Sequence, residues 1–354
     1  MEQSNDSKYS IEVYTDADQL IAELSGRAMQ RDIHVIRNGS YSAEWHLDMD
    51  NLTKYAKTIN TPSNSILTAG KSRIIIKRLG VPLFGGRLIY AEGNVAEKKD
   101  MDLKVMGWFD LLQYRFTSIS RTFTATDAGA MAWTLIQENQ ALTHGDLGIT
   151  EGNIATSVNR DRVWEFKKIR DAIIELSAVE SGFDFEITPQ KVFNVFYPSM
   201  GIKQDGYEFV YPGNIQSFKI SDDANQLLNY AIVRGQGFGG GQELDVLEDS
   251  ASEIEFGIMQ NVLDFSDVPD ITTLDSLGNE QINIYKKPVR ILELVLSPNS
   301  LPIVGSYWLG DQVKVRIETI DYYEDVNAYF RIDDIEIKID ENDSEAVTLK
   351  LTSI

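Results

Sequence analysis

The amino-acid sequence predicts a mainly β protein with α+β insertions, built around two similar small antiparallel β-barrels. Apolar and polar residues alternate over Met101–Val105, which is the period of a half-buried strand. Gly85 and Gly86 interrupt the preceding β-forming run, where glycine is typical of a bulge or of a bend at a barrel corner. The same pattern returns over 309–351, which indicates the second barrel.

The chain of 354 residues is too long for a single hydrophobic core, so it predicts several domains. Changes in the residue pattern divide it into five expected parts. These are a disordered N-terminus at 1–8, a first tube-forming β-barrel at 9–107, an α+β insertion domain at 108–206, a second tube-forming β-barrel at 207–242 and 289–354, and a small helical or loop subdomain at 243–288.

Two local patterns stand out within the first barrel. Apolar residues at helical spacing predict a helix over 16–31, although an internal glycine weakens the pattern. Asn38-Gly39 separates two β-forming runs and predicts a hairpin with a type I′ turn, because both residues accept the positive φ that this turn requires.

The insertion domain and the subdomain carry helix signals. Thr126-Asp127 is placed to cap a helix that ends near Asn139. A second helix is expected from near Asp161 to Gly182, followed by a hairpin over 183–197. A further helical segment is expected in the subdomain, around 271–284.

Charge and composition exclude several classes of function. The chain has 33 basic and 54 acidic residues, a net charge of −21, whereas a protein that binds duplex nucleic acid needs a cationic surface. It has no cysteine, which excludes disulfide scaffolds, zinc ribbons, thiol nucleophiles and iron–sulfur clusters. The polar N-terminus lacks the features of a signal peptide, and no apolar run is long enough to span a bilayer. We therefore expect a protein made in a cytoplasm, without stable membrane insertion.

The glycine-rich stretch Gly235–Gly241 follows a predicted strand, as phosphate-binding loops do. A phosphate cradle also needs a helix N-terminus directly after it. Acidic residues follow here instead, so the stretch predicts a hairpin tip. The histidines His34, His46 and His144 lack the spacing of a helical metal pair. His34 and His46 are placed across the predicted hairpin from each other, but no third ligand accompanies them.

Paired carboxylates lie mostly at predicted turns and strand ends, where solvated positions are expected rather than acid–base catalysis. These pairs are Asp222-Asp223, Glu253 with Glu255, Asp333-Asp334, and Asp340-Glu341 with Asp343. Three evenly spaced aspartates lack the residue order of a calcium loop: Asp264, Asp267 and Asp270. The sequence therefore predicts no enzyme, and no catalytic, cofactor-binding or metal-binding residue.

Six stretches, in this order, carry a family resemblance: the hairpin 36–45, the strands 70–76 and 83–89, the strand exit 107–112, the helix-to-strand junction 182–185, and the late strand 309–315. The chain resembles the hub proteins of phage tail tips and baseplates, the family that includes the N-terminal part of siphophage tail-associated lysins. The order of the elements carries the resemblance, and it covers most of the chain.

The resemblance implies a structural virion protein, a trimeric hub at the distal end of a phage tail. Each subunit would contribute two similar barrels, so that three chains form a pseudo-sixfold ring that adapts the sixfold tail tube to a threefold tip. The implied partners are two further copies of the chain, a tail tube or distal tail protein, a central tip or fibre protein and a tape measure protein.

The resemblance also gives the charge a meaning, because DNA would pass through an acidic lumen without specific binding. The protein would be made in the host cytoplasm and located at the virion tail tip. Relatives often carry a C-terminal lytic domain, and this chain ends at Ile354 directly after its last predicted strand. We therefore expect any lytic activity to come from another chain.

Two other functions stay open. One is a receptor- or glycan-binding tail protein or adhesin that uses exposed aromatic residues, and the other is an acid glycosidase. Internal repetition discriminates among the three, because a hub needs two equivalent barrels and the others do not.

Overall fold

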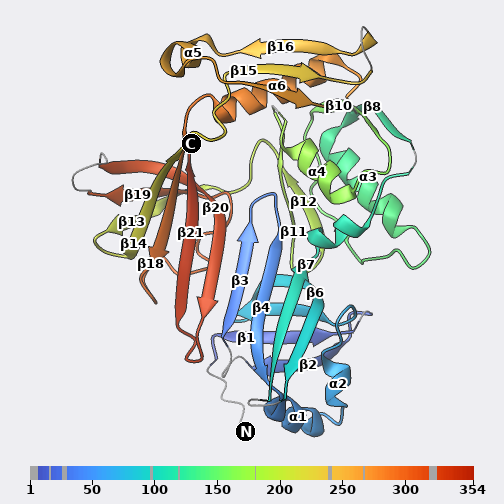
Figure 1. Ribbon diagram of the computed structural model, residues 1–354. Helices are drawn as coiled ribbons and strands as arrows, with labels where there is room; N and C mark the ends of the chain where they lie inside the picture. Colours follow the sequence, from blue (N-terminus) through green and yellow to red (C-terminus); the bar gives the residue numbers. More distant parts are fainter. Residues whose placement is uncertain are drawn as a thin grey trace.

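The computed structural model describes residues 7–15, 17–25, 30–95, 99–118, 120–179, 181–237, 241–265, 268–318 and 325–354. Strands predominate, and the helices are short and lie in loops, insertions and the subdomain (Figure 1). The mainly β class with α+β insertions is therefore confirmed. Most of the N-terminal segment expected to be disordered, residues 1–6, lies outside the described residues.

The first region holds seven strands and two short helices. They are β1 (Tyr9–Tyr14), β2 (Leu20–Ser25), β3 (Arg31–Ile36), β4 (Tyr41–Asp48), α1 (Met49–Thr58), α2 (Ser63–Ile66), β5 (Arg73–Arg78), β6 (Val81–Asn94) and β7 (Asp100–Gly107).

The second region holds six strands drawn from two stretches of the chain. They are β13 (Lys203–Tyr211), β14 (Ile215–Asp223), β18 (Val289–Leu296), β19 (Gln312–Ile317), β20 (Val326–Ile339) and β21 (Glu345–Ser353).

All thirteen of these strands, as far as the structure describes them, belong to one sheet. Its main path runs β14-β18-β21-β20-β3-β4-β7-β6-β5-β1-β2, and β19 links β13 to β20. The two regions join where β20 pairs antiparallel with β3, from Asp334 opposite Ile36 to Ile339 opposite Arg31. The regions expected as two separate barrels therefore share a continuous sheet, which is visible in the middle of Figure 1.

The two regions repeat the same strand order. In the first region the neighbours are β5-β6-β7-β4-β3, and in the second they are β19-β20-β21-β18-β14. Corresponding strands also follow one another in the same order along the chain. Each region has one long strand, β6 or β20, that pairs with different neighbours along its two halves. The expected internal repetition is thus present as strand order.

A bulge marks the bend of each long strand. The register shifts after Leu88 in β6 and after Ile332 in β20. Gly86 lies just before the first bulge, and a Cβ built there would lie 2.3 Å from the carbonyl oxygen of Met106. A side chain at this position would therefore push β6 and β7 apart, which explains the glycine within an otherwise β-forming run.

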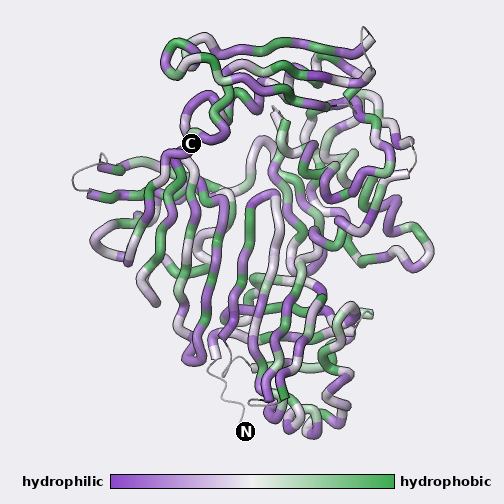
Figure 2. The backbone as a smooth tube through the Cα atoms, in the orientation of Figure 1, coloured by the Kyte–Doolittle hydropathy of each residue, from purple (hydrophilic) through white to green (hydrophobic). Residues whose placement is uncertain are grey.

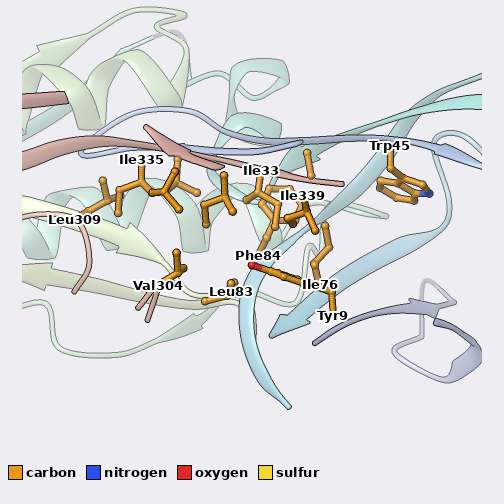
Figure 3. Close-up of a cluster of buried hydrophobic side chains, with 14 of the residues drawn as sticks. Tyr9, Ile33, Trp45, Ile76, Leu83, Phe84, Val304, Leu309, Ile335 and Ile339 are labelled. Carbon is orange, nitrogen blue, oxygen red and sulfur yellow. The ribbon is translucent and has the colours of Figure 1, made fainter. Parts of the chain in front are cut away.

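One hydrophobic core lies beneath both regions. Figure 3 shows Ile33 and Phe84 of the first region in the same cluster as Val304, Leu309 and Ile335 of the second. Burial of these apolar side chains holds the shared sheet together, at about 25 cal/mol per Å² removed from water.

The insertion domain has its own core and comprises eight elements. They are the 3₁₀ helix η1 (Phe109–Tyr114), β8 (Arg121–Asp127), α3 (Ala128–Gln140), β9 (Thr150–Glu151), β10 (Asn159–Trp164), α4 (Ile169–Ser177), β11 (Asp184–Ile187) and β12 (Val192–Phe196). The Asp127 side chain accepts from the backbone N–H groups of Gly129 and Ala130, so the predicted cap is confirmed. The β11–β12 hairpin is antiparallel, as predicted.

The subdomain is a three-stranded sheet with two helices. It consists of β15 (Tyr230–Arg234), β16 (Leu244–Glu248), α5 (Ser250–Phe256), β17 (Gln260–Asp264) and α6 (Ile271–Tyr285). The expected boundary at 242/243 differs from this arrangement, because β15 pairs with β16 and β17 rather than with the second barrel. Ala231 and Val233 of β15 pack against α6, so the strand follows its apolar contacts.

Three local expectations were wrong. The helix predicted over 16–31 is replaced by β2, where Ala22 and Leu24 are buried and Glu23 is exposed, a period of two. The helix predicted from Asp161 begins only at Ile169, because β10 pairs with β8. At the predicted type I′ turn only Asn38 has a positive φ, of 52°, and the N–H of Gly39 donates to the carbonyl of Ile36.

The turn between β3 and β4 joins three parts of the molecule. The Arg37 guanidinium contacts Asp184 of the insertion domain and Asp333 of the second region, each at 2.6 Å. The Asn38 side chain also donates to Asp184 and accepts from the N–H of Phe185. Asp184 is only 4% exposed, so its charge depends on Arg37 and Asn38 of this turn and on the N–H of Met200, which donates to its other oxygen.

We expect Arg37→Ala to lower the free energy of unfolding by about 3 kcal/mol, because it leaves a buried carboxylate without its cation. Arg37→Lys should cost less, since it keeps the charge and loses the two-pronged geometry. Urea unfolding would measure both. Arg290→Ala, at an exposed ion pair with Asp222, is the control and should change little. Equal losses for Arg37→Ala and Arg290→Ala would contradict this role.

Candidate functional site: the polar face of the shared sheet

The eight neighbouring strands from β14 to β6 have two chemically different faces. Residues paired in register point to the same side of a sheet, so the pairing assigns each side chain to a face. One face carries the buried apolar residues of the core. The other, here called the polar face, carries the alternate residues. Figure 2 shows the resulting alternation of hydrophobic and hydrophilic positions along these strands.

Acidic side chains outnumber basic ones on the polar face. Among the described, register-paired residues of these eight strands, ten are acidic: Asp32, Glu44, Asp48, Glu92, Asp100, Asp102, Asp223, Glu293, Asp334 and Glu336. Six are basic: Arg87, Lys104, Lys219, Arg331, Lys338 and Lys350. Cross-strand ion pairs, such as Lys104–Glu44 at 3.0 Å, neutralise some of the acidic side chains. The net negative charge of the polar face is therefore moderate.

A shallow hollow of about 330 Å³ lies on this face over β3, β4, β7 and β6. Asp32, Glu44, Glu92 and Asp102 line it, with Lys104 as a cation. Burial raises the pKa of Asp32, and one of its carboxylate oxygens has no hydrogen-bond partner. Acidic side chains therefore outnumber basic ones in the lining of the hollow.

The junction of the two regions carries a three-residue ionic cluster. Asp334 contacts His34 at 2.7 Å and the Lys350 amine at 3.0 Å. The hydrogen bond to Asp334 raises the pKa of His34 above its ordinary 6.5, against the opposing effect of partial burial. Burial also opposes ionisation of Asp334, but the hydrogen bonds from His34 and Lys350 hold its pKa below the usual range. The charges thus stabilise the β3–β20 pairing.

A row of four paired residues is repeated in the two regions. Each row starts with the residue directly after the bulge of the long strand. It continues with a lysine on the second strand and a glutamate on the third, and it ends on the fourth strand. The rows are Tyr90, Lys104, Glu44 and Asp32 in the first region, and Asp334, Lys350, Glu293 and Lys219 in the second. The strands β6, β7, β4 and β3 therefore correspond in register to β20, β21, β18 and β14.

The polar face ends in two edges with further pairing capacity. Among the described strands, β14 pairs only with β18. The half of β6 that follows Leu88 forms a β-ladder only with β7, within the same described part of the chain. Each edge therefore keeps backbone groups available for pairing with a further strand.

The structure separates the histidines that the sequence placed across a hairpin. His34 is paired with Ser42, not with His46. Each histidine contacts its own carboxylate, Asp334 for His34 and Asp102 for His46. No group of three His, Cys, Asp or Glu side chains in the described part of the chain is arranged to hold a metal ion.

The carboxylate pairs that the sequence suggested lie in structurally different positions. Asp333-Asp334 lies inside β20 at its bulge, not at a turn or strand end, and joins the two regions through Arg37 and His34. Sequence reasoning missed this role, because the partners are about 300 residues away. Asp340 and Asp343 do lie at a turn, although Asp343 also contacts the buried Arg31 at 2.6 Å.

The glycine-rich stretch Gly235–Gly241 connects β15 to β16, which pair antiparallel, so it is the loop of a hairpin as expected. Residues 238–240 and Asp267 of the evenly spaced aspartates lie outside the described residues. Within the described residues no helix is both long and apolar enough to cross a membrane.

No protein-family model matches the sequence, and no curated protein does. Solved structures do share its architecture. A tail protein from Neisseria meningitidis has a TM-score of 0.66 at 13% identity, covering 98% of this chain and 96% of that one. The 43 kDa tail protein of prophage MuSo2 from Shewanella oneidensis has a TM-score of 0.65 at 12% identity, covering 97% and 98%. The chain has the fold of phage tail proteins.

A more distant structure belongs to a component of the Escherichia coli type VI secretion system. It is described as similar to the T4 bacteriophage tail proteins gp27 and gp5. Its TM-score is 0.51 at 9% identity, covering 98% of this chain and 77% of that one. The phage tail fold thus spans the whole chain, including its insertion domain and subdomain, at low sequence identity.

We expect His34 to titrate above its ordinary pKa of 6.5 in the folded protein. Because this pKa is raised on folding, the contribution to stability is present at low pH and is lost as the pH rises through the folded value. NMR of ¹³C-labelled histidine would follow the titration, since the chain has only 3 histidines. Asp334→Asn should return the His34 pKa towards 6.5. An unchanged titration in that variant would refute the assignment.

Proposed function

We propose that this protein is a structural component of a phage virion, a trimeric hub at the distal end of the tail. The three chains close into a ring of six similar regions, which joins the sixfold tail tube to a threefold tip. The polar face forms part of the channel through which the genome is delivered. The observation that carries this proposal is the repeat of strand order and register, which leaves complementary edges at the two ends of one sheet.

The junction within the chain serves as the template for the junction between chains. Inside the chain, β3 pairs with the half of β20 that follows the bulge, with His34 opposite Glu336. Since β14 corresponds to β3 and β6 to β20, β14 of one chain would pair with β6 of the next. The same register would place Ser221 opposite Glu92, with Lys219 diagonal to Glu92 as a favourable charge pair.

Closure of this kind fixes the geometry of the assembly. Head-to-tail contacts form rings when the rotation between subunits closes. Eight strands from each of three chains give about 24 strands, a circumference of about 115 Å at about 4.8 Å per strand, and a diameter of about 37 Å. A barrel of this size encloses a channel rather than a packed interior. Pairing would also remove both exposed edges.

The proposed role requires no catalytic step. The partners implied by the role are the tail tube or distal tail protein, a central tip or fibre protein and the tape measure protein. The acidic excess on the polar face supports a channel wall that repels DNA, because like charges repel within the Debye length of about 8–10 Å. The adhesin and glycosidase alternatives gain no comparable support, since neither needs a repeated strand order.

The edge pairing predicts a specific cross-link between subunits. The chain has no cysteine, so Ser221→Cys with Glu92→Cys introduces the only thiols. Opposed residues of antiparallel strands have Cα atoms about 4.5–5.5 Å apart, within the range for a disulfide. We expect mild oxidation to give a covalent trimer on a non-reducing gel.

The single-cysteine variants are the controls and should stay monomeric on the gel. Within one chain the two positions lie at opposite ends of the eight-stranded sheet, too far apart to form a disulfide. Any cross-link must therefore join two chains. A monomeric mass for the native protein by analytical ultracentrifugation, together with no cross-linked trimer, would overturn the proposal.

The acidic wall predicts a change in DNA binding on charge reversal. We expect the trimer with Glu44→Lys, Asp102→Lys and Glu336→Lys to bind short duplex DNA at physiological ionic strength. The affinity should fall steeply as the salt concentration rises. The native trimer should not bind this DNA. Electrophoretic mobility shift would measure both. Reversal of Glu151, Glu165 and Glu341, outside the polar face, is the matched control, and equal binding by that control would refute the assignment of the wall.

A further inference from the structure

The sheet of the subdomain is covered on one side only. Ala231 and Val233 of β15 face α6, together with the partly buried Leu247 and Leu263. In Figure 1 α6 is seen below this sheet, on the side of the remaining chain. The alternate residues of the three strands point the other way, and within the described residues no element covers them.

An apolar band crosses this outer face. Ile232 is paired with Val246 on one side and with Val262 on the other, so the three side chains lie in one row. Val246 is 41% exposed and Val262 is 45% exposed. Leu244, the neighbour of Val246 on the same face, is 54% exposed. Monomeric proteins seldom expose contiguous apolar area of this kind without a binding role.

Three further exposed apolar residues lie near the end of the sheet. Met259 accepts backbone hydrogen bonds from Asn229 and Tyr230, which places it beside the start of β15. Ile254 of α5 and Ile258 of the following loop are also exposed. Six strongly exposed apolar side chains therefore fall within residues 244–262. We call the surface formed by Ile232, Leu244, Val246 and Val262, over β15, β16 and β17, the outer face of the subdomain.

The charge around the outer face is mainly negative, with Glu248 and Asp264 on the face itself. Residues 243–285 contain eleven Asp or Glu and no Lys or Arg. The one cation on the described part of the face, Arg234, is held by the Asp264 carboxylate.

The apolar band and the surrounding negative charge limit which kinds of partner can bind the outer face. Nucleic acid and anionic membrane surfaces carry the same charge and would be repelled. A second copy of the chain would bring two acidic rims together, which costs several kcal/mol at an interface. A protein surface with apolar residues flanked by Lys and Arg matches both the band and its rim. We propose that the outer face binds a basic, amphipathic segment of another protein.

The proposal does not depend on ring closure, because the outer face belongs to the subdomain and not to the shared sheet. Its test uses a defined probe, a peptide of about eighteen residues with leucine on one side of a helix and lysine on the other. We expect one peptide per chain, and Val246→Ser with Val262→Ser should weaken binding at least tenfold. Isothermal titration calorimetry on the full chain would measure both values.

Two further variants separate charge from apolar contact. Glu243→Gln, Glu248→Gln and Glu253→Gln together should weaken binding severalfold and flatten its salt dependence. Leu20→Ser with Leu142→Ser, at exposed positions elsewhere, is the matched control and should bind as the native chain does. Hydrogen exchange should slow over 244–262 when the peptide is added.

Binding that is unchanged by Val246→Ser with Val262→Ser would overturn the proposal, because the peptide would then adsorb to acidic charge in general. Loss of self-association in the same variant, measured by sedimentation, would also overturn it, because the outer face would then bind a second copy. Circular dichroism should be unchanged, since both valines are solvent-exposed in the folded chain.

Discussion

The arrangement of the whole chain depends on one half-buried cation, Arg37. Its guanidinium lies between Asp333 of the second region and Asp184 of the insertion domain, and its backbone N–H donates to the carbonyl of Asp333. A strand that slips by one residue turns every side chain to the other face of the sheet, so register has to be specified wherever one face is buried. The ionic contacts of Arg37 specify it at the β3–β20 junction. Although burial opposes its charge, the carboxylates of Asp333 and Asp184 raise the pKa of Arg37, so the charge persists at any physiological pH.

A correct register at this junction gives the shared sheet one apolar and one polar side over its full width. The charge of the polar side could not be inferred from the net charge of −21, because the acidic residues are unevenly distributed. Residues 243–285 account for eleven of them without any basic residue, and they belong mainly to the subdomain. On the polar face, lysines and arginines alternate with the carboxylates, so its acidic excess is smaller and partly paired. The two acidic surfaces therefore have different chemistry. On the polar face, carboxylates are partly paired with lysines and arginines. On the subdomain, carboxylates lie near exposed apolar side chains.

The sequence predicted the features that depend on neighbouring residues. Alternation identified β7, Asp127 identified the start of α3, and the pattern shared by 83–105 and 313–351 indicated that the two regions are related. Features that depend on distant residues were missed. Leu20 and Leu24 have helical spacing, yet the chain is extended there because β2 pairs with β1. Asp333-Asp334 looks like a solvated pair in sequence, and only the distant Arg37 and His34 give it a role. The surface of the subdomain was missed for the same reason, because β15 joins β16 and β17 only in three dimensions.

The repeat also explains why the two kinds of junction would differ in strength. In the junction within the chain, the bulge residue Asp333 contacts Arg37, the residue that follows β3. By the correspondence of the rows, Ile89 takes the place of Asp333 in β6, and Ala224 takes the place of Arg37 after β14. The junction proposed between chains would therefore have backbone pairing and apolar contact but no buried ion pair. Ile89 is 42% exposed in the single chain, so pairing of this edge would bury apolar surface. A junction of this composition allows each chain to fold with its own register fixed before it meets its neighbours.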